Sequence, residues 1–68
     1  MNIRRYWITL EDIPGLFTDF YGYCDVDLDY EQPPQVGDWV VVTRIEDGGN
    51  TLRDQFGQVK EIHYFEDL

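Results

Sequence analysis

Apolar and acidic residues alternate strictly in the middle of this chain. An apolar row of Cys24, Val26, Leu28 and Tyr30 is interleaved with an acidic row of Asp25, Asp27, Asp29 and Glu31. Successive side chains of a β-strand point to opposite faces, so this period of two predicts a strand over Tyr21–Tyr30 with one apolar and one acidic face. Pro33 and Pro34 end the strand, because neither residue can donate a hydrogen bond to a β-ladder.

Four other segments have the composition of strands, namely Ile3–Leu10, Trp39–Ile45, Thr51–Phe56 and Gln58–Phe65. In the first of these, the alternation predicts one face with Tyr6, Ile8 and Leu10 and the opposite face with Arg5, Trp7 and Thr9. The run from Trp39 is the most apolar and is rich in β-branched residues, which favours a central, buried strand. We therefore expect Trp39, Val41 and Val59 in the hydrophobic core.

Strong helix formers are scarce in this chain. It has no Ala, one Met and one Lys, whereas Val, Ile, Thr and the aromatic residues are abundant. This balance favours strands over helices. The segment Leu10–Phe20 is expected to hold at most one or two turns of helix, because Pro14 and Gly15 interrupt it. The glycine-rich segment 46–50 predicts a turn, and Gly57 predicts a bulge or tight turn. The expected fold is a single acidic domain over residues 1–68, mainly β, with five short antiparallel strands in a small barrel or strongly twisted sheet.

Two segments resemble a known class of small β-barrel. Val36–Val42 carries a Gly-Asp turn that leads into a strand, and Phe56–Ile62 carries a later Gly-x-Val strand. This arrangement resembles SH3-like and KOW-type barrels over residues 36–62, which implies a five-stranded SH3-like barrel. Many KOW-type modules contact RNA or ribosomal protein through basic loops, whereas the loops of this chain are acidic.

The charge of the chain restricts its partners. Fourteen acidic residues and five basic residues give a net charge of −9. A nucleic-acid ligand and an anionic membrane surface would both be repelled, so we expect neither. The expected partner is a basic protein. The chain has neither an apolar run of the roughly 20 residues that span a bilayer nor the apolar region of a signal peptide, so a cytoplasmic location is expected. With 43% hydrophobic and 16% aromatic residues, the chain can still build a core.

The residues available for catalysis or metal binding are few. The chain has no Ser, and Cys24 and His63 are its only Cys and His. The alternation makes Cys24 a small buried residue, and His63 is expected at an edge, so no nucleophile–base pair is predicted and no enzyme activity is expected. The spacing Asp-x-Asp-x-Asp opens a calcium-binding loop of the EF-hand type, but the required Gly and Glu positions hold Tyr30 and Val36. No metal or other cofactor is expected.

Two interpretations of the acidic row remain open. Alternate side chains on a strand lie about 6.5–7 Å apart, so four carboxylates in a row imitate regularly spaced phosphates and could occupy a basic groove. Alternatively, the row is the solvated face of an edge strand, where charge deters aggregation. Close to it, a Gly-flanked aromatic loop could supply exposed interface anchors. The predicted partner-binding residues are the acidic row together with Asp19, Phe20, Tyr21 and Tyr23.

The function that these features favour is that of a small acidic inhibitor or modulator. It would occlude a basic site on a nucleic-acid-binding protein. In size and charge the chain resembles the short acidic proteins that phages and mobile elements direct against host enzymes, among them anti-CRISPR proteins and DNA mimics. That resemblance implies a host-takeover role. The alternative is an SH3-like accessory subunit of a larger complex, without mimicry, in which the acids keep the protein soluble. A homodimer is compatible with either function.

Overall fold

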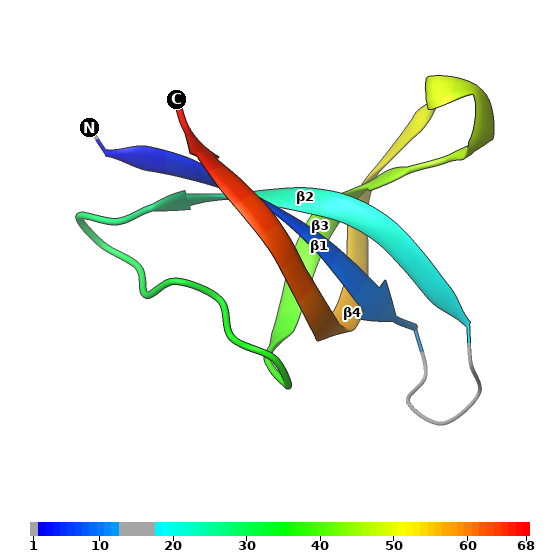
Figure 1. Cartoon of the computed structure of the whole chain (residues 1–68), viewed down its shortest axis with the longest axis horizontal. Coiled ribbons are helices and arrows are strands. Elements are labelled where there is room, and N and C mark those ends of the chain that lie inside the picture. The colour runs from blue at the N-terminus through cyan, green and yellow to red at the C-terminus, as the bar shows by residue number, and fades with distance from the viewer. Residues whose placement is uncertain (1, 13–17) are drawn as a thin grey trace.

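Four antiparallel strands close into a ring in a computed structural model of the chain, which describes residues 2–12 and 18–68 (Figure 1). The strands are β1 (Ile3–Glu11), β2 (Asp19–Asp27), β3 (Trp39–Ile45) and β4 (Thr51–Asp67). Each strand pairs with its neighbour in sequence, and β4 also pairs with β1 to complete the ring. The mainly β fold is therefore confirmed. The two ends of the chain lie side by side, and the Leu68 N–H donates to the Ile3 carbonyl at 3.0 Å.

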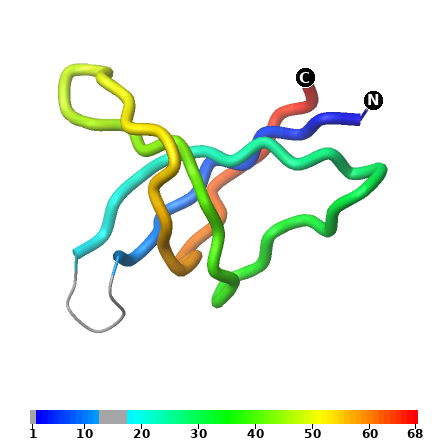
Figure 2. Tube along the Cα trace, turned by 180° about the vertical axis from the view of Figure 1, so that it is seen from behind, coloured from blue at the N-terminus to red at the C-terminus, as the bar shows by residue number. Residues whose placement is uncertain are grey.

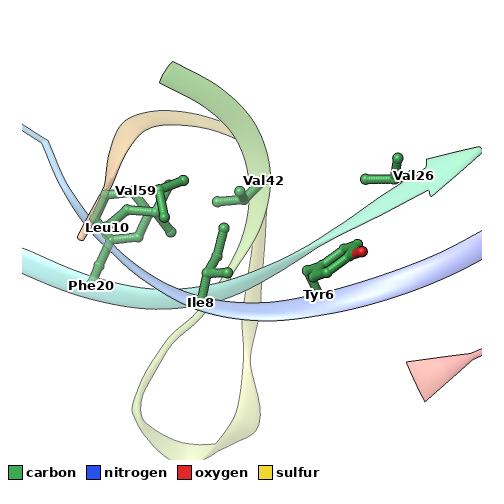
Figure 3. Packing of buried hydrophobic residues seen from close by; sticks show 7 residues of the cluster. All are labelled: Tyr6, Ile8, Leu10, Phe20, Val26, Val42 and Val59. Carbon is green, nitrogen blue, oxygen red and sulfur yellow. The ribbon is translucent and has the colours of Figure 1, made fainter. Parts of the chain in front are cut away.

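The core is the inner face of this ring, and β1 supplies much of it. Tyr6, Ile8 and Leu10, which the alternation of β1 groups on one face, are all buried, and Ile8 and Leu10 are fully enclosed. The other buried side chains come from the remaining strands and are Phe20, Val26, Val42 and Val59. Figure 3 shows Leu10, Phe20 and Val59 gathered at one end of this cluster, with Ile8 and Val42 next to them and Tyr6 and Val26 toward the other end.

The prediction that Trp39 and Val41 are core residues is wrong, whereas that for Val59 is confirmed. The Trp39 and Val41 side chains are 47% and 55% exposed, and Val59 is 2% exposed. Every residue from Trp39 to Val42 is apolar, so the sequence pattern does not distinguish the two faces of β3. The ring places Val42 inside, and Val40 packs against the core cluster, so Trp39 and Val41 point outward.

The five-strand count is not confirmed, because the segments predicted as the last two strands form one continuous strand. β4 is 17 residues long. Its first half pairs with β3 and its second half with β1, so it bends across the ring. A bulge opposite Val42–Arg44, where Asp54 has a positive φ of 57°, contributes to this bend. At Gly57, a Cβ atom would lie 3.0 Å from the Glu11 carbonyl oxygen and from the Phe20 ring, so the close passage favours glycine.

β2 is shorter than the alternation predicts and ends at Asp27. Residues 28–30 form a turn, and a wide connection then swings out from the ring before it returns to β3 (Figure 2). Gly37 ends this connection with a positive φ of 97°, and its N–H donates to the Val59 carbonyl at 2.8 Å. The predicted turn after β3 is confirmed and contains a short 3-10 helix, Asp47–Gly49. The helix predicted within Leu10–Phe20 falls partly on residues 13–17, outside the described residues; Leu10 and Glu11 end β1, and Asp19 and Phe20 begin β2.

Candidate functional site

The acidic row does not form a line of four carboxylates on one strand face. Of its members, only Asp25 and Asp27 lie on β2, and Arg5 of β1 neutralises Asp25 on the outer face with two hydrogen bonds of 2.8 and 3.0 Å. The hydrogen bond to Asp25 is the main reason why the pKa of Arg5 is raised above its ordinary value. The Arg5 guanidinium also lies 4.1 Å from the centre of the Tyr23 ring, a cation–π contact.

The rest of the acidic row shapes the turn that follows β2. The Asp27 N–H donates to the Glu31 carboxylate at 3.0 Å, and the Asp29 N–H donates to the Asp27 carboxylate at 3.1 Å. The Asp27 carbonyl accepts hydrogen bonds from the Tyr30 and Glu31 N–H groups at 2.9 and 2.8 Å. The predicted strand over Tyr21–Tyr30 is therefore wrong beyond Asp27. The backbone N–H groups of Asp29, Tyr30 and Glu31 form hydrogen bonds within a turn and not with a neighbouring strand.

From Asp19 to Tyr23, the predicted aromatic loop lies in strand β2, and its first residues, 16 and 17, lie outside the described residues. Phe20 is 6% exposed and belongs to the core, so in this fold it is not an exposed anchor. Asp19 forms an ion pair of 2.8 Å with Lys60, which also lies 3.6 Å from the Glu11 carboxylate. The hydrogen bond to Asp19 is the largest cause of the raised pKa of Lys60. The partner-binding roles of Asp19, Tyr21 and Tyr23 stay predictions.

Tyr21 and Tyr23 belong to an aromatic cluster on the outer face of β1, β2 and β4. Its centre is Trp7, whose ring lies 5.8 Å from Tyr21, 5.0 Å from Tyr23 and 6.0 Å from Tyr64. The Trp7 indole N–H donates to Glu66 at 3.0 Å. We call these four rings the Trp7 cluster. Because the Trp7 and Tyr21 side chains are partly buried and stack on one another, the cluster braces three strands from outside.

A pocket of about 470 Å³ lies where β2 and β3 diverge. β2 and β3 pair only over Tyr21–Tyr23 and Thr43–Ile45, whereas β2 pairs with β1 along its whole length. The pocket is lined by residues of β2, of the connection and of β3: Cys24, Asp25, Val26, Glu31, Gln32, Pro34, Asp38, Trp39, Val40 and Val41. We call it the β2–β3 pocket. It contains two members of the acidic row, Asp25 and Glu31.

The acids of the β2–β3 pocket differ in how their charges are balanced. Asp25 is paired with Arg5, as described above. Glu31 and Asp38 instead accept hydrogen bonds from backbone N–H groups of their own turns, for Asp38 from Gln35 at 2.9 Å. Both are exposed, and within residues 2–12 and 18–68 neither forms an ion pair with a basic side chain. The pocket therefore presents negative charge to solvent.

Beside this pocket lies an outer apolar patch of Trp39, Val41 and Phe56, of which Trp39 and Val41 were predicted to lie in the core. Trp39 stacks on Phe56 of β4 with 5.3 Å between ring centres, and Val41 pairs directly with Phe56. All three side chains are about half exposed. Because apolar residues occupy both faces of β3, no signal in the sequence distinguishes this patch from the core.

The structure does not bring Cys24 and His63 together. Cys24 lies on β2 at the pocket, packed against the core. Burial is the main cause that raises the pKa of its thiol to about 11, and the nearby Asp25 and Glu31 carboxylates add to it. The thiol is therefore protonated at neutral pH and is a weak nucleophile there. His63 lies on β4, within 2.7 Å of the Thr9 hydroxyl and edge-on to Tyr21.

Within the part of the chain that the structure describes, no three His, Cys, Asp or Glu side chains are grouped so that they could hold a metal ion. No helix in the same residues has the length and hydropathy needed to cross a membrane. No protein-family model, curated protein or solved structure matches the chain. The resemblance of residues 36–62 to SH3-like and KOW-type barrels therefore stays a prediction.

Proposed function

We propose that this protein is a small acidic binding module that docks on a basic surface of another protein and so blocks that partner's access to nucleic acid. The observation that carries the proposal is the position of the β2–β3 pocket, with its carboxylates, directly beside the outer apolar patch. Protein interfaces combine a few aromatic anchors with a polar rim, and here Trp39 and Phe56 are the anchors and Glu31 and Asp38 belong to the rim.

The mechanism divides the work between charge and apolar contact. A net charge of −9 attracts a basic partner over long distances and accelerates the encounter. Carboxylates that no described cation neutralises then pair with Lys and Arg side chains and fix the orientation of the complex. The stacked Trp39 and Phe56 rings provide apolar area that leaves water on binding. The partner's phosphate-binding residues are covered, and nucleic acid is excluded by direct occlusion.

A pair of charge-matched double variants tests this proposal. Glu31→Gln with Asp38→Asn removes two charges at the pocket and keeps the acceptor oxygens that hold the turns. Asp47→Asn with Asp54→Asn removes two charges from exposed sites in the 3-10 turn and on β4. We expect the pocket variant to bind the basic partner recovered from host lysate about tenfold more weakly than wild type, and the control variant to bind nearly as tightly.

The same variants show whether binding blocks nucleic acid. Wild-type protein should displace labelled nucleic acid from the recovered partner, and the pocket variant should need a higher concentration. Equal binding by both double variants would leave the pocket without a role in recognition, and a partner that keeps its nucleic acid in the complex would contradict occlusion.

The exposed Trp39–Phe56 stack also supports a second candidate, an SH3-like accessory subunit that docks through apolar contact alone. Affinity measured against salt concentration separates the two functions. Binding steered by charge weakens steeply between about 50 and 500 mM salt, because the range of electrostatic interactions shortens from more than 10 Å to a few ångströms. Apolar docking would be nearly insensitive to salt and would depend on Trp39 in place of Glu31 and Asp38.

A further inference from the structure

β2 and β3 continue beyond the point where they pair. Tyr21 pairs with Ile45 and Tyr23 with Thr43, so the same register continued would pair Asp25 with Val41. The structure has no such pair. The two strands separate, and the β2–β3 pocket takes the place of the missing rungs, lined by Cys24–Val26 on one side and Trp39–Val41 on the other. Beyond the short ladder that closes the ring, two strand edges therefore face one another without pairing.

The alternation of ladder hydrogen bonds shows which backbone groups face this opening. In β2, the Leu28 N–H donates to the Asn2 carbonyl at 2.9 Å, so even-numbered residues bond to β1 and odd-numbered residues face β3. The backbone of Asp27 is already used in its turn. Asp25 is left as the residue whose N–H and carbonyl groups face the pocket.

The opposite edge follows from β3. Thr43 and Ile45 are the residues that pair with β2. The bulge in the β3–β4 ladder lies in β4, which has the additional residue, so β3 keeps its alternation. The N–H and carbonyl groups of Val41 and Trp39 therefore also face the pocket. Unpaired backbone groups on two facing edges form a template for an added strand.

We propose that an extended basic segment of the partner protein binds in the β2–β3 pocket as an additional strand, paired with Asp25 on one edge and with Val41 and Trp39 on the other. The proposal rests on the proposed function and specifies how the partner is held. The added strand would fill the gap between β2 and β3 beyond the ladder that closes the ring. The pocket volume of about 470 Å³ lies in the range of ligand-binding pockets, about 300–1,000 Å³.

The residues that line the pocket indicate which side chains that segment would carry. On the core side lie Val26 and Val40, which favour small or β-branched apolar residues. The exposed residues Glu31 and Asp38 also line the pocket, and their carboxylates favour Lys or Arg. Because side chains alternate along a strand, the segment that fits has basic residues alternating with residues such as Val. Charge selects this occupant over a second copy of the chain, since two copies would each carry −9.

A synthetic peptide of this pattern, acetyl-Lys-Val-Lys-Val-Lys-Val-amide, tests the proposal. We expect it to bind, to shift the NMR amide signals of Asp25, Trp39 and Val41, and to slow hydrogen exchange at these amides. Two further peptides are the controls. One has N-methyl groups on two of the valines, which keeps the charge but removes N–H groups that pair with one edge. The other has Glu in place of every Lys.

The N-methylated peptide is expected to bind at least about tenfold more weakly, because two backbone hydrogen bonds are lost. The acidic peptide should not bind. On the protein, Val41→Pro removes the N–H that faces the pocket and should weaken the unmethylated peptide, whereas Val41→Thr keeps that N–H and should not. If Val41→Pro fails to fold, the peptide pair still decides the question, because it leaves the protein unchanged.

The possible failures are distinguishable from failure of the proposed function. Equal affinity for the methylated and unmethylated peptides would overturn strand addition and leave charge-steered docking intact. No binding of the basic peptide would also overturn it, while the double variant at Glu31 and Asp38 and its control at Asp47 and Asp54 test docking of the whole partner separately. A concentration-dependent dimer with slowed exchange at Asp25 and Val41 without any peptide would show that a second copy is the occupant.

Discussion

At the scale of single residues, β3 buries Val42 and exposes Trp39 and Val41, which the sequence predicts as core residues. Val42 is 3% exposed, whereas Trp39 is 47% exposed and stacks on Phe56 from outside. The consequence for stability differs from what the sequence predicts for a core Trp, namely a loss of about 3–5 kcal/mol on truncation to Ala. A half-exposed ring in one stacked pair contributes less to the free energy of unfolding than a core Trp does.

We therefore expect Trp39→Ala to lower the free energy of unfolding by only about 1–2 kcal/mol, from the lost stacking and partial burial. Ile8→Ala is the matched core variant. Ile8 is fully enclosed, so its truncation should cost about 2–5 kcal/mol and unfold much of the protein. Urea denaturation followed by circular dichroism measures both. A Trp39→Ala variant that is unfolded in buffer would restore Trp39 to the core.

At the scale of elements, the weakest connection in the ring is the pairing of β2 with β3. It extends only over Tyr21–Tyr23, and Gly22 lies at its centre opposite Arg44. Gly22 has a specific reason to be glycine, because a Cβ atom there would overlap the Thr43 carbonyl oxygen on the neighbouring strand. The approach of the two backbones at this point depends on the absent side chain.

Gly22→Ala should therefore force β2 and β3 apart and lower stability by about 1–3 kcal/mol, with hydrogen-exchange protection lost first at Tyr21 and Tyr23. The control is Gly48→Asn in the 3-10 turn. Gly48 has a φ of 83° with open space around it, and Asn tolerates that conformation better than other residues do. Unchanged exchange at Tyr21 and Tyr23 in Gly22→Ala would mean that the two backbones can adjust at no cost.

The acidic row also changes its meaning at this scale. If the row were one face of a strand, replacing Asp25, Asp27 and Asp29 with Asn would relieve repulsion and leave stability unchanged or raise it. In the structure, Asp25 is paired with Arg5 and the Asp27 carboxylate accepts a turn hydrogen bond. Neutralising the row would therefore remove a pair that joins β1 to β2 and would not simply relieve repulsion.

At the scale of the whole molecule, local ion pairs and overall charge act in opposite directions. The cations Arg4, Arg5, Arg44 and Lys60 each lie on the ring and pair with at least one carboxylate from another segment. Nevertheless the net charge is −9 on a molecule of 36 × 27 × 19 Å. At about 0.01 M salt the screening length is about 30 Å, so the acids repel one another across the whole protein; at about 0.15 M it is about 8 Å.

We expect the melting temperature to rise as NaCl increases from about 10 to 150 mM, because screening shortens the reach of this repulsion more than it weakens contacts of about 3 Å. Differential scanning calorimetry measures the shift, and sucrose at matched osmolarity controls for general solute effects. A melting temperature that falls with NaCl would show that the inter-strand ion pairs dominate the electrostatic free energy.

The sequence by itself determined the type of element and much of the first strand. In β1 the alternation correctly groups Tyr6, Ile8 and Leu10 on one face, and the structure shows that this face is the buried one. The shortage of helix formers likewise indicates a mainly β chain, which the structure confirms.

The tertiary structure decided the features that depend on contacts between distant residues. Closure of the ring selects which of two apolar faces of β3 turns inward. It also joins Thr51–Phe56 and Gln58–Phe65 into one bent strand. Arg5 reaches Asp25 from 20 residues away, and the β2–β3 pocket exists because two strands separate after a short ladder. A sequence period of two predicts which side chains share a face of a strand. Only packing against the other strands determines which face is buried and which strand edges stay unpaired.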